Sequence, residues 1–268
     1  MFVKYLFTVL ASCALVGTGQ AEVIRVGGTG SGLGTLRLIG DAFEKANPQH
    51  RIELAPSLGS AGGLKALRAG QLQLAVSNRE PSADDRAAGL QSHRFASTPL
   101  AVVTHAGVPA TAMTRERLAQ LLNGQEARWP GGQPVRLVLR PLTDGDSKLL
   151  ASLSPAVEAA LRQAHTRPGM MVAQTDSEAA DYIERTPFAM GLVAVGQVGS
   201  EQRKLNVLSL DGASATPAAL QSNRYPMSKE MLLVMRSDAS EAVRAFVNFV
   251  SDSPQAVSIL SRTGHVVR

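Results

Sequence analysis

Two glycine-rich turns are the first residues in the chain whose types and spacing could bind a ligand. They are Gly28-Thr-Gly-Ser-Gly32 and Ser57-Leu-Gly-Ser-Ala-Gly-Gly63. Each follows an apolar run typical of a strand and precedes a segment typical of a helix. A turn at that place leaves the first N–H groups of the helix without partners, and the helix dipole adds positive potential. The pattern predicts a small-anion site that uses Ser31, Gly32 and Ser60.

Each feature of these turns has a simpler explanation. The glycines of the first turn can be there only for the backbone dihedrals that a turn needs. Ser60 can be a plain helix N-cap. We favour a binding role for Ser60 because Gly62 and Gly63 would let the backbone approach a ligand closely.

Arg140 is the third candidate, because it ends the apolar run Val135 to Leu139. Ligands of open α/β sheets bind at the carboxyl ends of strands. A guanidinium group also matches two oxygens of an oxyanion at once. The alternative is a salt bridge to Asp144 or Asp146, and both roles can hold together.

Composition excludes several other functions. The chain has 268 residues, of which 44% are apolar, so it can bury a sizeable core. Aromatic residues make up only 4%, and the net charge of +5 comes from scattered basic residues, which argues against nucleic-acid binding. The five histidines lie far apart, and the chain has neither a nucleophile elbow nor a Walker lysine. We therefore expect no enzyme activity, no metal and no cofactor.

The N-terminus has the pattern of a secretory signal peptide, residues 1–21. Lys4 precedes an apolar stretch from Tyr5 to Val16, and small residues lead to a cleavage site after Ala21. The only cysteine, Cys13, lies inside this segment, where Leu10-Ala-Ser-Cys13 also resembles a lipobox that would anchor the protein to lipid. Because the apolar region before Cys13 is short and continues after it, we expect release into the periplasm.

The rest of the chain alternates strand and helix patterns, which predicts an α/β fold with a mostly parallel sheet. The absence of a flexible linker favours two lobes joined by ordered crossings. The expected strands are Val23 to Val26, Ile52 to Ala55, Leu72 to Ser77, Leu100 to His105, Val135 to Leu139, Met190 to Val195 and Met231 to Met235. The expected helices are Leu36 to Ala46, Leu64 to Ala69, Thr114 to Leu122, Lys148 to Leu153, Pro155 to Ala164, Asp176 to Glu184, Ala239 to Val250 and Pro254 to about Gly264.

The order of these pieces resembles the periplasmic phosphate-binding proteins of ABC transporters, which have the type II periplasmic binding protein fold. The resemblance covers nearly all of the mature chain. The segments that carry it are Gly28 to Gly32, Gly59 to Gly63, Leu74 to Pro81, Leu122 to Pro130, Val138 to Arg140, Asp144 to Ser147, Met190 to Val193, Tyr225 to Ser228 and Phe246 to Gly264.

The resemblance implies a Venus-flytrap architecture, with a mostly parallel sheet flanked by helices in each lobe. Lobe one would comprise residues 22–99 and 229–268, and lobe two residues 100–228. The implied function is a monomeric solute-binding protein that captures a small oxyanion, phosphate foremost, and hands it to the permease of an ABC importer. The alternatives are another oxyanion, a small zwitterion, or a ligand-responsive module that docks on a signalling or structural partner.

The sequence departs from the family pattern at two places. Asn78 stands where the family has an aspartate that accepts the proton of hydrogen phosphate. An amide lacks the fixed negative charge of that aspartate, and the interaction of such a charge with a second unit charge 4 Å away is worth about 4 kcal/mol at an effective dielectric constant near 20. Asp144 and Asp146 flank Gly145 where the family has Ser-Gly-Thr, so they oppose an oxyanion unless one pairs with Arg140, accepts a ligand proton, or meets a positive ligand group. The predicted ligand-binding set is Ser31, Gly32, Ser60, Asn78, Arg140, Gly145 and Ser147.

Overall fold

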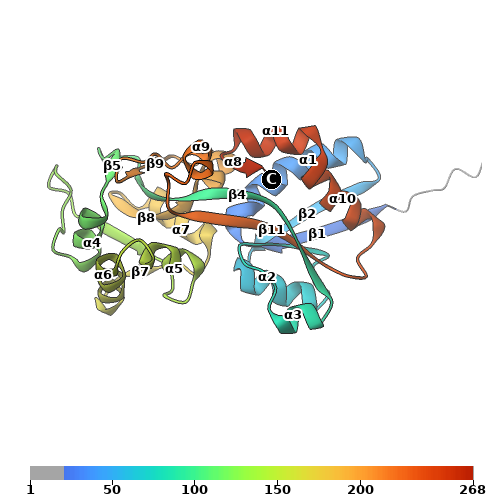
Figure 1. Ribbon diagram of the computed structural model, residues 1–268, viewed down its shortest axis with the longest axis horizontal. Coiled ribbons are helices and arrows are strands. Elements are labelled where there is room, and N and C mark those ends of the chain that lie inside the picture. Colours follow the sequence, from blue (N-terminus) through green and yellow to red (C-terminus); the bar gives the residue numbers. More distant parts are fainter. Residues whose placement is uncertain (1–20, 268) are drawn as a thin grey trace, which may run out of the picture.

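The structure, a computed structural model, describes residues 21–267 and consists of two lobes side by side along its long axis (Figure 1). Two neighbouring strands run from one lobe to the other, β4 (Leu90–His105) and β11 (Ser228–Arg236). They are antiparallel, with Ser228 opposite Pro99 and Arg236 opposite Leu90. From Leu100 onward β4 pairs instead with a strand of the second lobe. The two strands therefore form the connection between the lobes.

The N-terminal lobe, as we name it, contains both ends of the described chain. Its sheet has the order β2-β1-β3-β11-β4, in which β1 pairs in parallel with β2 and β3. Its strands are β1 (Glu22–Gly28), β2 (His50–Ser57), β3 (Leu74–Ser77) and β12 (Val266–Val267). Its helices are α1 (Gly30–Ala46), α2 (Gly59–Arg68), α3 (Ala83–Ala87), α10 (Glu241–Asp252) and α11 (Pro254–Arg262).

The middle lobe continues the sheet in the order β4-β8-β6-β7, in which β6 pairs in parallel with both β7 and β8. Its strands are β5 (Ala112–Met113), β6 (Arg136–Leu139), β7 (Met171–Val172), β8 (Ala189–Ala194), β9 (Leu205–Val207) and β10 (Ser209–Leu210). Its helices are α4 (Arg115–Asn123), α5 (Gly145–Ala151), α6 (Pro155–Thr166), α7 (Asp176–Arg185), α8 (Val195–Glu201) and α9 (Pro217–Gln221).

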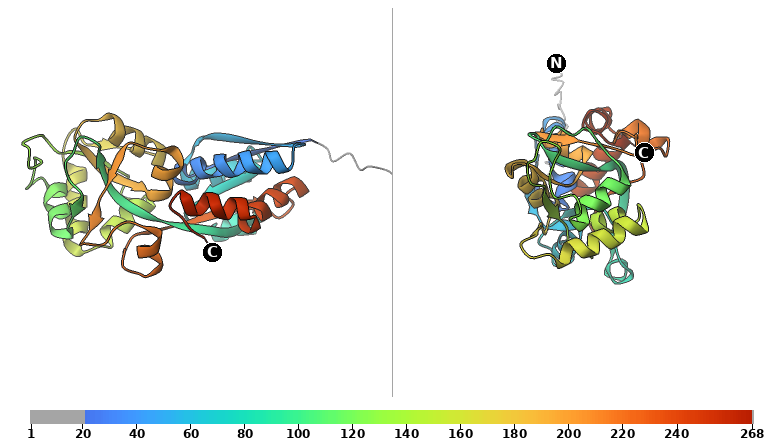
Figure 2. Two further views of the ribbon diagram at one scale, coloured as in Figure 1. Left: turned by 90° about the horizontal axis from the view of Figure 1, so that it is seen from above. Right: turned by 90° about the vertical axis from the view of Figure 1, so that its left-hand side faces the viewer.

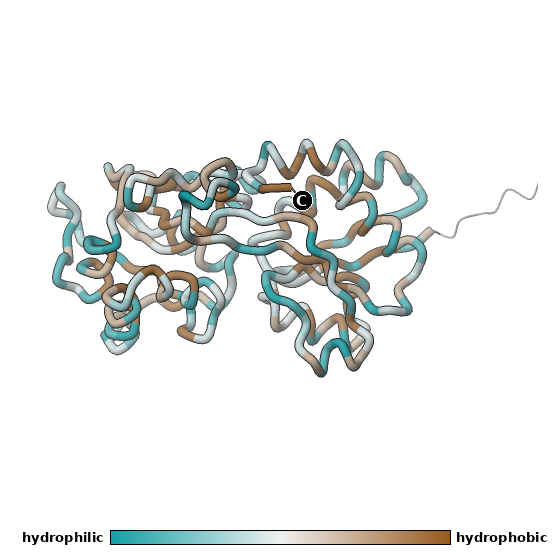
Figure 3. Tube along the Cα trace, in the orientation of Figure 1, coloured by the Kyte–Doolittle hydropathy of each residue, from teal (hydrophilic) through white to brown (hydrophobic). Residues whose placement is uncertain are grey.

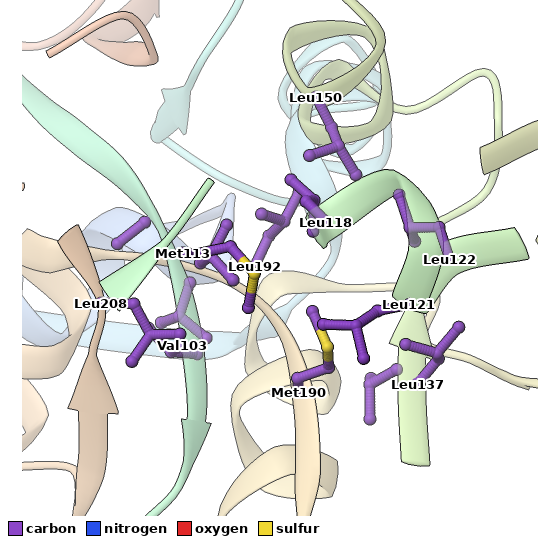
Figure 4. Close-up of a cluster of buried hydrophobic side chains, with 14 of the residues drawn as sticks. Val103, Met113, Leu118, Leu121, Leu122, Leu137, Leu150, Met190, Leu192 and Leu208 are labelled. Atoms are coloured by element: carbon purple, nitrogen blue, oxygen red, sulfur yellow. The ribbon is translucent and has the colours of Figure 1, made fainter. Parts of the chain in front are cut away.

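Each lobe has its own hydrophobic core, and the apolar stretches of the trace run through the two interiors (Figure 3). In the N-terminal lobe, Leu36, Ile39 and Phe43 follow helical spacing along α1 and are buried against α10, where Phe43 meets Phe246 edge-on at 5.1 Å. In the middle lobe, leucines of α4 meet side chains of β8 and β6 (Figure 4). The lobe boundaries at residues 99/100 and 228/229 stay a prediction, which this division of the core supports.

The view from above shows α1 and α11 side by side over the N-terminal lobe, with β4 curving toward the middle lobe (Figure 2). The crossing strands β4 and β11 are antiparallel to their neighbours β3 and β8, so the sheet is parallel only toward its two ends. None of the helices in residues 21–267 is long and apolar enough to cross a membrane.

Three helices begin earlier than the sequence predicts. The expected starts were Leu36, Leu64 and Lys148, whereas α1, α2 and α5 begin at Gly30, Gly59 and Gly145. Sequence reasoning assigns glycine to turns because it weakens helices. In α1 the glycine is required by packing: a Cβ on Gly32 would lie 2.6 Å from the methyl carbon of Met231 and 2.7 Å from a methyl of Val76. The glycine-rich segments are thus first turns of helices.

Candidate functional site

A cavity of about 250 Å³ lies where helix N-termini from both lobes meet. The N-terminal lobe contributes Thr29, which precedes α1, and the first turn of α2. The middle lobe contributes the starts of α5 and α7. Arg140, which follows β6, and Lys229, in the crossing strand β11, complete the wall. Helix starts from both lobes therefore face one chamber, together with the cationic side chains of Arg140, Lys229 and the exposed Arg79.

The two helices of the N-terminal lobe begin without a side-chain cap. Thr29 before α1 and Leu58 before α2 accept no hydrogen bond from their helices through their side chains. The first N–H groups of such a helix have no intrahelical acceptor. By contrast, Asp144 caps α5 by accepting from the N–H of Asp146 at 2.9 Å, and Thr175 caps α7. The starts of α1 and α2 are thus the ones suited to an anion.

Arg140 is buried, with 4% of its side chain exposed. Its Nη2 lies 2.8 Å from Oδ2 of Asp144, and its Nη1 donates to the carbonyl of Ala173 at 3.3 Å. The alternative salt bridge considered for this arginine is therefore present, with Asp144 as the partner. Guanidinium has five N–H donors, so these bonds leave donors for a further acceptor.

Lys229 is the centre of a buried ion cluster. Its Nζ lies 2.6 Å from Oδ1 of Asp146 and 2.5 Å from Oδ1 of Asp176. The exposed fractions of the three side chains are 4%, 4% and 7%. Lys229 comes from a crossing strand, and both carboxylates come from the starts of middle-lobe helices. The cluster therefore holds the connecting strand against the middle lobe.

The pKa values of the two carboxylates in this cluster are shifted in opposite directions. Burial raises the pKa of Asp146 to about 6; Lys229 opposes the rise, and the carboxylates of Asp176 and Asp144 add to it. Burial also acts to raise the pKa of Asp176, but Lys229 and Arg140 outweigh it and hold the pKa at about 2. Near neutral pH, Asp176 is firmly ionised, whereas Asp146 is the carboxylate closest to taking up a proton.

A hydrogen-bonded group surrounds Asn78. Its Oδ1 lies 2.7 Å from the hydroxyl of Thr29 and 2.9 Å from that of Ser31. Its Nδ2 donates to the carbonyl of Glu230 at 2.8 Å, and this acceptor-only partner fixes the orientation of the amide. Its backbone N–H donates to the hydroxyl of Ser60 at 3.0 Å. Asn78 thus joins both glycine-rich helix starts to strand β11.

Thr29 connects the lobes directly. Its hydroxyl lies 2.7 Å from Oδ2 of Asp176 as well as 2.7 Å from Asn78. A hydroxyl has a single proton. If Thr29 donates that proton to the carboxylate, Ser31 supplies the donor for Asn78, and both hydroxyl protons are used. The N-cap of α1 in one lobe is then bound to the first residue of α7 in the other.

Comparison with known proteins identifies the family of this chain. A family model described as "PBP superfamily domain" matches residues 16–253. The chain belongs to the PBP superfamily. Within it, the phosphate-binding protein PstS of Borreliella burgdorferi is 24% identical over 202 residues, which are 73% of this chain and 72% of that protein.

Solved structures show the same fold for this PBP-superfamily chain. A putative phosphate ABC transporter substrate-binding protein from Clostridium perfringens, with bound phosphate, matches at a TM-score of 0.75 and 18% identity, over 92% of this chain and all of that one. The periplasmic molybdate-binding protein of Azotobacter vinelandii matches at 0.65 and 17% identity, over 91% and 99%. The predicted two-lobed α/β fold and the resemblance to periplasmic phosphate-binding proteins are confirmed.

The structure brings four of the seven predicted site residues of this PBP-superfamily chain into the cavity wall: Ser60, Asn78, Arg140 and Gly145. Ser31 is fully buried behind Asn78. The other two lie outside the wall. The N–H of Gly32 donates to the carbonyl of Thr29, and the hydroxyl of Ser147 donates to the carbonyl of Arg140 at 2.9 Å. The contacts of these seven residues with a ligand stay predictions.

The sequence interpretation of Gly63 needs correction. It was expected to let the backbone approach a ligand, but a Cβ at Gly63 would lie 2.6 Å from the Cα of Gly28. This glycine therefore allows helix α2 to pack closely on strand β1. A side chain there would push the helix from the sheet and displace the start of α2 from the cavity.

Sequence reasoning missed Thr29, Asp176 and Lys229. Asp176 was recognised only as the start of a helix, and Thr29 only as part of a glycine turn. Lys229 carried a usable signal, because it stands two residues before the predicted strand Met231 to Met235, with Glu230 between them. A lysine buried in a strand needs an anionic partner, but the sequence does not say which helix supplies it.

The cavity offers acid side chains, yet they do not form a metal site. Within residues 21–267, no group of three or more histidine, cysteine, aspartate or glutamate side chains could hold a metal ion. The carboxylates of Asp146 and Asp176 instead share the ammonium group of Lys229.

Proposed function

We propose that this protein is an extracytoplasmic solute-binding protein that captures a small oxyanion, phosphate foremost, and delivers it to an ABC importer. The observation that carries the proposal is the single chamber lined by Thr29 at the start of α1, by the uncapped start of α2 and by the buried cations Arg140 and Lys229. Backbone N–H groups at helix starts and guanidinium forks are the groups that proteins use to bind phosphate. The protein performs no chemistry on its ligand.

In this proposal the direct contacts come from both lobes. The start of α2 supplies backbone N–H groups and the hydroxyl of Ser60, and the start of α5 supplies the N–H of Gly145. Arg140 donates from its remaining N–H groups while Asp144 holds its fork in place. Asn78 lines the wall and orients Ser60 through its backbone N–H. A ligand held in this way bridges the lobes.

The carboxylates of the cavity favour a ligand that carries a proton. Hydrogen phosphate has a P–OH group that donates to a carboxylate, and Asp144 and Asp146 occupy the wall beside Gly145. These two acids, together with Asp176, also favour a second candidate, a small zwitterion with an ammonium group. The two candidates share the oxyanion contacts and differ in the group that faces the acids.

The named relatives support the oxyanion class. Several are phosphate-binding proteins by name, including the receptor for ABC-type phosphate transport from Vibrio cholerae, and one binds molybdate. Phosphate and molybdate are both tetrahedral oxyanions of similar size. This chain shares their fold over more than nine-tenths of its length.

The proposal includes the predicted architecture and location. Residues 22–99 and 229–268 form lobe one, and residues 100–228 form lobe two. The lobes close on the ligand as a hinge, with β4 and β11 as the crossings. Residues 1–20 lie outside the described part of the chain. We propose that residues 1–21 direct export to the periplasm, with cleavage after Ala21. The mature protein acts as a monomer on its permease.

A thermal-shift screen of the mature protein tests the ligand class. It includes phosphate, sulfate, molybdate, simple phosphonates, aminophosphonates and amino acids. A ligand at about 100 times its dissociation constant stabilises the fold by about 2.7 kcal/mol, which raises Tm by about 5–10 °C in a domain of this size. We expect the largest shift with phosphate. A larger shift with aminophosphonates favours the zwitterion, and no shift with any compound favours a module that docks on a protein partner.

A further inference from the structure

The two halves of the cavity wall differ in charge. In the described chain, the N-terminal lobe contributes one cation to the wall, Arg79, and no carboxylate. The middle lobe contributes Arg140 together with all three carboxylates of the wall, and the crossing strand β11 adds Lys229. The starts of α1 and α2, which have no side-chain cap, also belong to the N-terminal half. The N-terminal half is therefore the one that attracts an anion.

The charges of Arg140 and Lys229 are already matched within the protein. Arg140 pairs with Asp144 at 2.8 Å, and Nζ of Lys229 lies 2.6 and 2.5 Å from two further carboxylates. Arg79 differs from both, because its guanidinium group has no hydrogen bond or ion pair with any residue that the structure describes. Arg79 is thus the wall cation whose charge is left for a ligand.

Two glutamates adjoin the turn that carries Arg79, and both are bound to another arginine. Glu80 follows Arg79 directly, and Glu230 accepts a hydrogen bond from Asn78 through its carbonyl. Nη2 of Arg94 lies 3.2 Å from Oε1 of Glu80, and its Nε lies 3.3 Å from Oε2 of Glu230. Because Arg94 binds both carboxylates, neither compensates the charge of Arg79.

The backbone of Arg79 is held in place, although its side chain has no partner. The hydroxyl of Ser77, which is fully buried, donates to the carbonyl of Arg79 at 2.7 Å and accepts from its N–H at 3.1 Å. The side chain is exposed and also lines the cavity, so the cavity reaches solvent beside it. A guanidinium group on a fixed backbone can pair with two oxygens of an oxyanion at a small ordering cost.

We propose that Arg79 is a further ligand-binding residue of this protein, whose guanidinium group pairs with the bound oxyanion where the cavity opens to solvent. This inference rests on the proposed function. The other contacts of the anion in this half are the N–H groups at the start of α2 and the hydroxyl of Ser60. Because Asn78 is neutral, the charge that the turn after β3 presents to the cavity is positive. The carboxylates of the middle lobe face the side of the ligand that carries a proton.

Calorimetric titration of inorganic phosphate into the mature protein tests this role. Arg79→Gln removes the charge, and Arg79→Lys keeps the charge but loses the two-oxygen fork. We expect Arg79→Gln to weaken binding about tenfold, between the effect of an exposed ion pair and that of a buried charge-assisted hydrogen bond. Arg79→Lys should weaken it less.

Arg37→Gln is the matched control. Arg37 is exposed on α1, has no hydrogen bond or ion pair with a described residue, and does not line the cavity. The substitution changes the net charge by the same amount as Arg79→Gln. We therefore expect the phosphate affinity of Arg37→Gln to stay within about twofold of the wild type, because distant exposed charges are screened.

Thermal unfolding distinguishes a ligand contact from a structural role. Since the guanidinium group of Arg79 bonds to no described residue, Arg79→Gln should unfold within about 2 °C of the wild type without ligand. With phosphate present, its rise in Tm should be smaller than that of the wild type. A large loss of stability without ligand would show that Arg79 supports the fold, and would overturn the inference.

The remaining outcomes also decide the matter. Wild-type affinity in Arg79→Gln, or an equal loss in Arg37→Gln, overturns the role of Arg79 and leaves the proposed function standing. A wild-type protein that binds neither phosphate nor another oxyanion is a different result, because it rejects the proposed function, and the inference with it.

Discussion

Replacement of Asn78 by aspartate tests the hydrogen-bonded group beside the cavity. In the wild type, Nδ2 of Asn78 donates to the carbonyl of Glu230 at 2.8 Å. In Asn78→Asp, an oxygen takes the place of that nitrogen, so two acceptors face each other. A buried carbonyl without its donor costs about 1–3 kcal/mol. We therefore expect Tm to fall by about 3–10 °C at pH 7.5 in a domain of this size.

The sign of the pH dependence distinguishes this mechanism. A protonated aspartic acid has an O–H group that can donate to the same carbonyl, so the folded state favours the protonated form and raises the pKa of the new carboxyl. Stability from such a group is present below its unfolded pKa and is lost as pH rises through the folded one. The deficit of Asn78→Asp should therefore shrink at about pH 4.5.

The assay is urea unfolding at both pH values, with Asn78→Ala as the control. The alanine variant loses the same bonds without gaining a charge, so its deficit should be similar at both pH values. An Asn78→Asp protein as stable as the wild type at pH 7.5 refutes the described orientation of the amide, and so does a deficit that grows as pH falls.

Three further predictions concern other parts of the molecule. Arg140→Ala should weaken phosphate binding at least about tenfold in calorimetry, because a charge-assisted hydrogen bond contributes about 1.5–3 kcal/mol; unchanged affinity in a folded variant removes Arg140 from the site. The pKa of Asp146 is raised to about 6 in the folded protein, so the stability that this carboxyl contributes is present below about pH 4 and is lost as pH rises toward 6. The stability of Asp146→Asn should therefore rise relative to that of the wild type, by up to about 3 kcal/mol, between about pH 4 and 7. Parallel pH profiles of the two proteins in urea unfolding contradict this. Mass spectrometry of the exported protein should give Glu22 as the first residue, and a mature chain that begins with acylated Cys13 would overturn cleavage after Ala21.

The sequence alone predicts the order of elements well, because apolar periodicity and caps are local signals. Thr114 caps α4 and Ser154 caps α6, so both helices begin within one residue of their expected starts. The starts of α1 and α2 were missed because glycine disfavours a helix locally. At Gly32, however, the close approach of Met231, about two hundred residues away in sequence, leaves no room for a Cβ and therefore favours glycine inside the helix.

The candidate site divides in the same way. Ser60 and Arg140 follow from their positions at strand and helix ends, and both line the cavity. The cluster of Lys229 with Asp146 and Asp176 depends on three elements that meet only in the folded chain. No local pattern relates a crossing strand to the starts of two helices. Which charges meet in the cavity therefore could not be predicted from the sequence alone.

The measurement that tests the central claim most directly is the location of a bound oxyanion. Arsenate has the shape and charge of phosphate, and its anomalous scattering identifies it in crystals of the mature protein. The account predicts one strong anomalous peak in the cavity between the lobes, within hydrogen-bond distance of Arg140, of Ser60 and of the N–H of Gly145. A peak elsewhere, or no peak in crystals of protein that binds phosphate in solution, would contradict it.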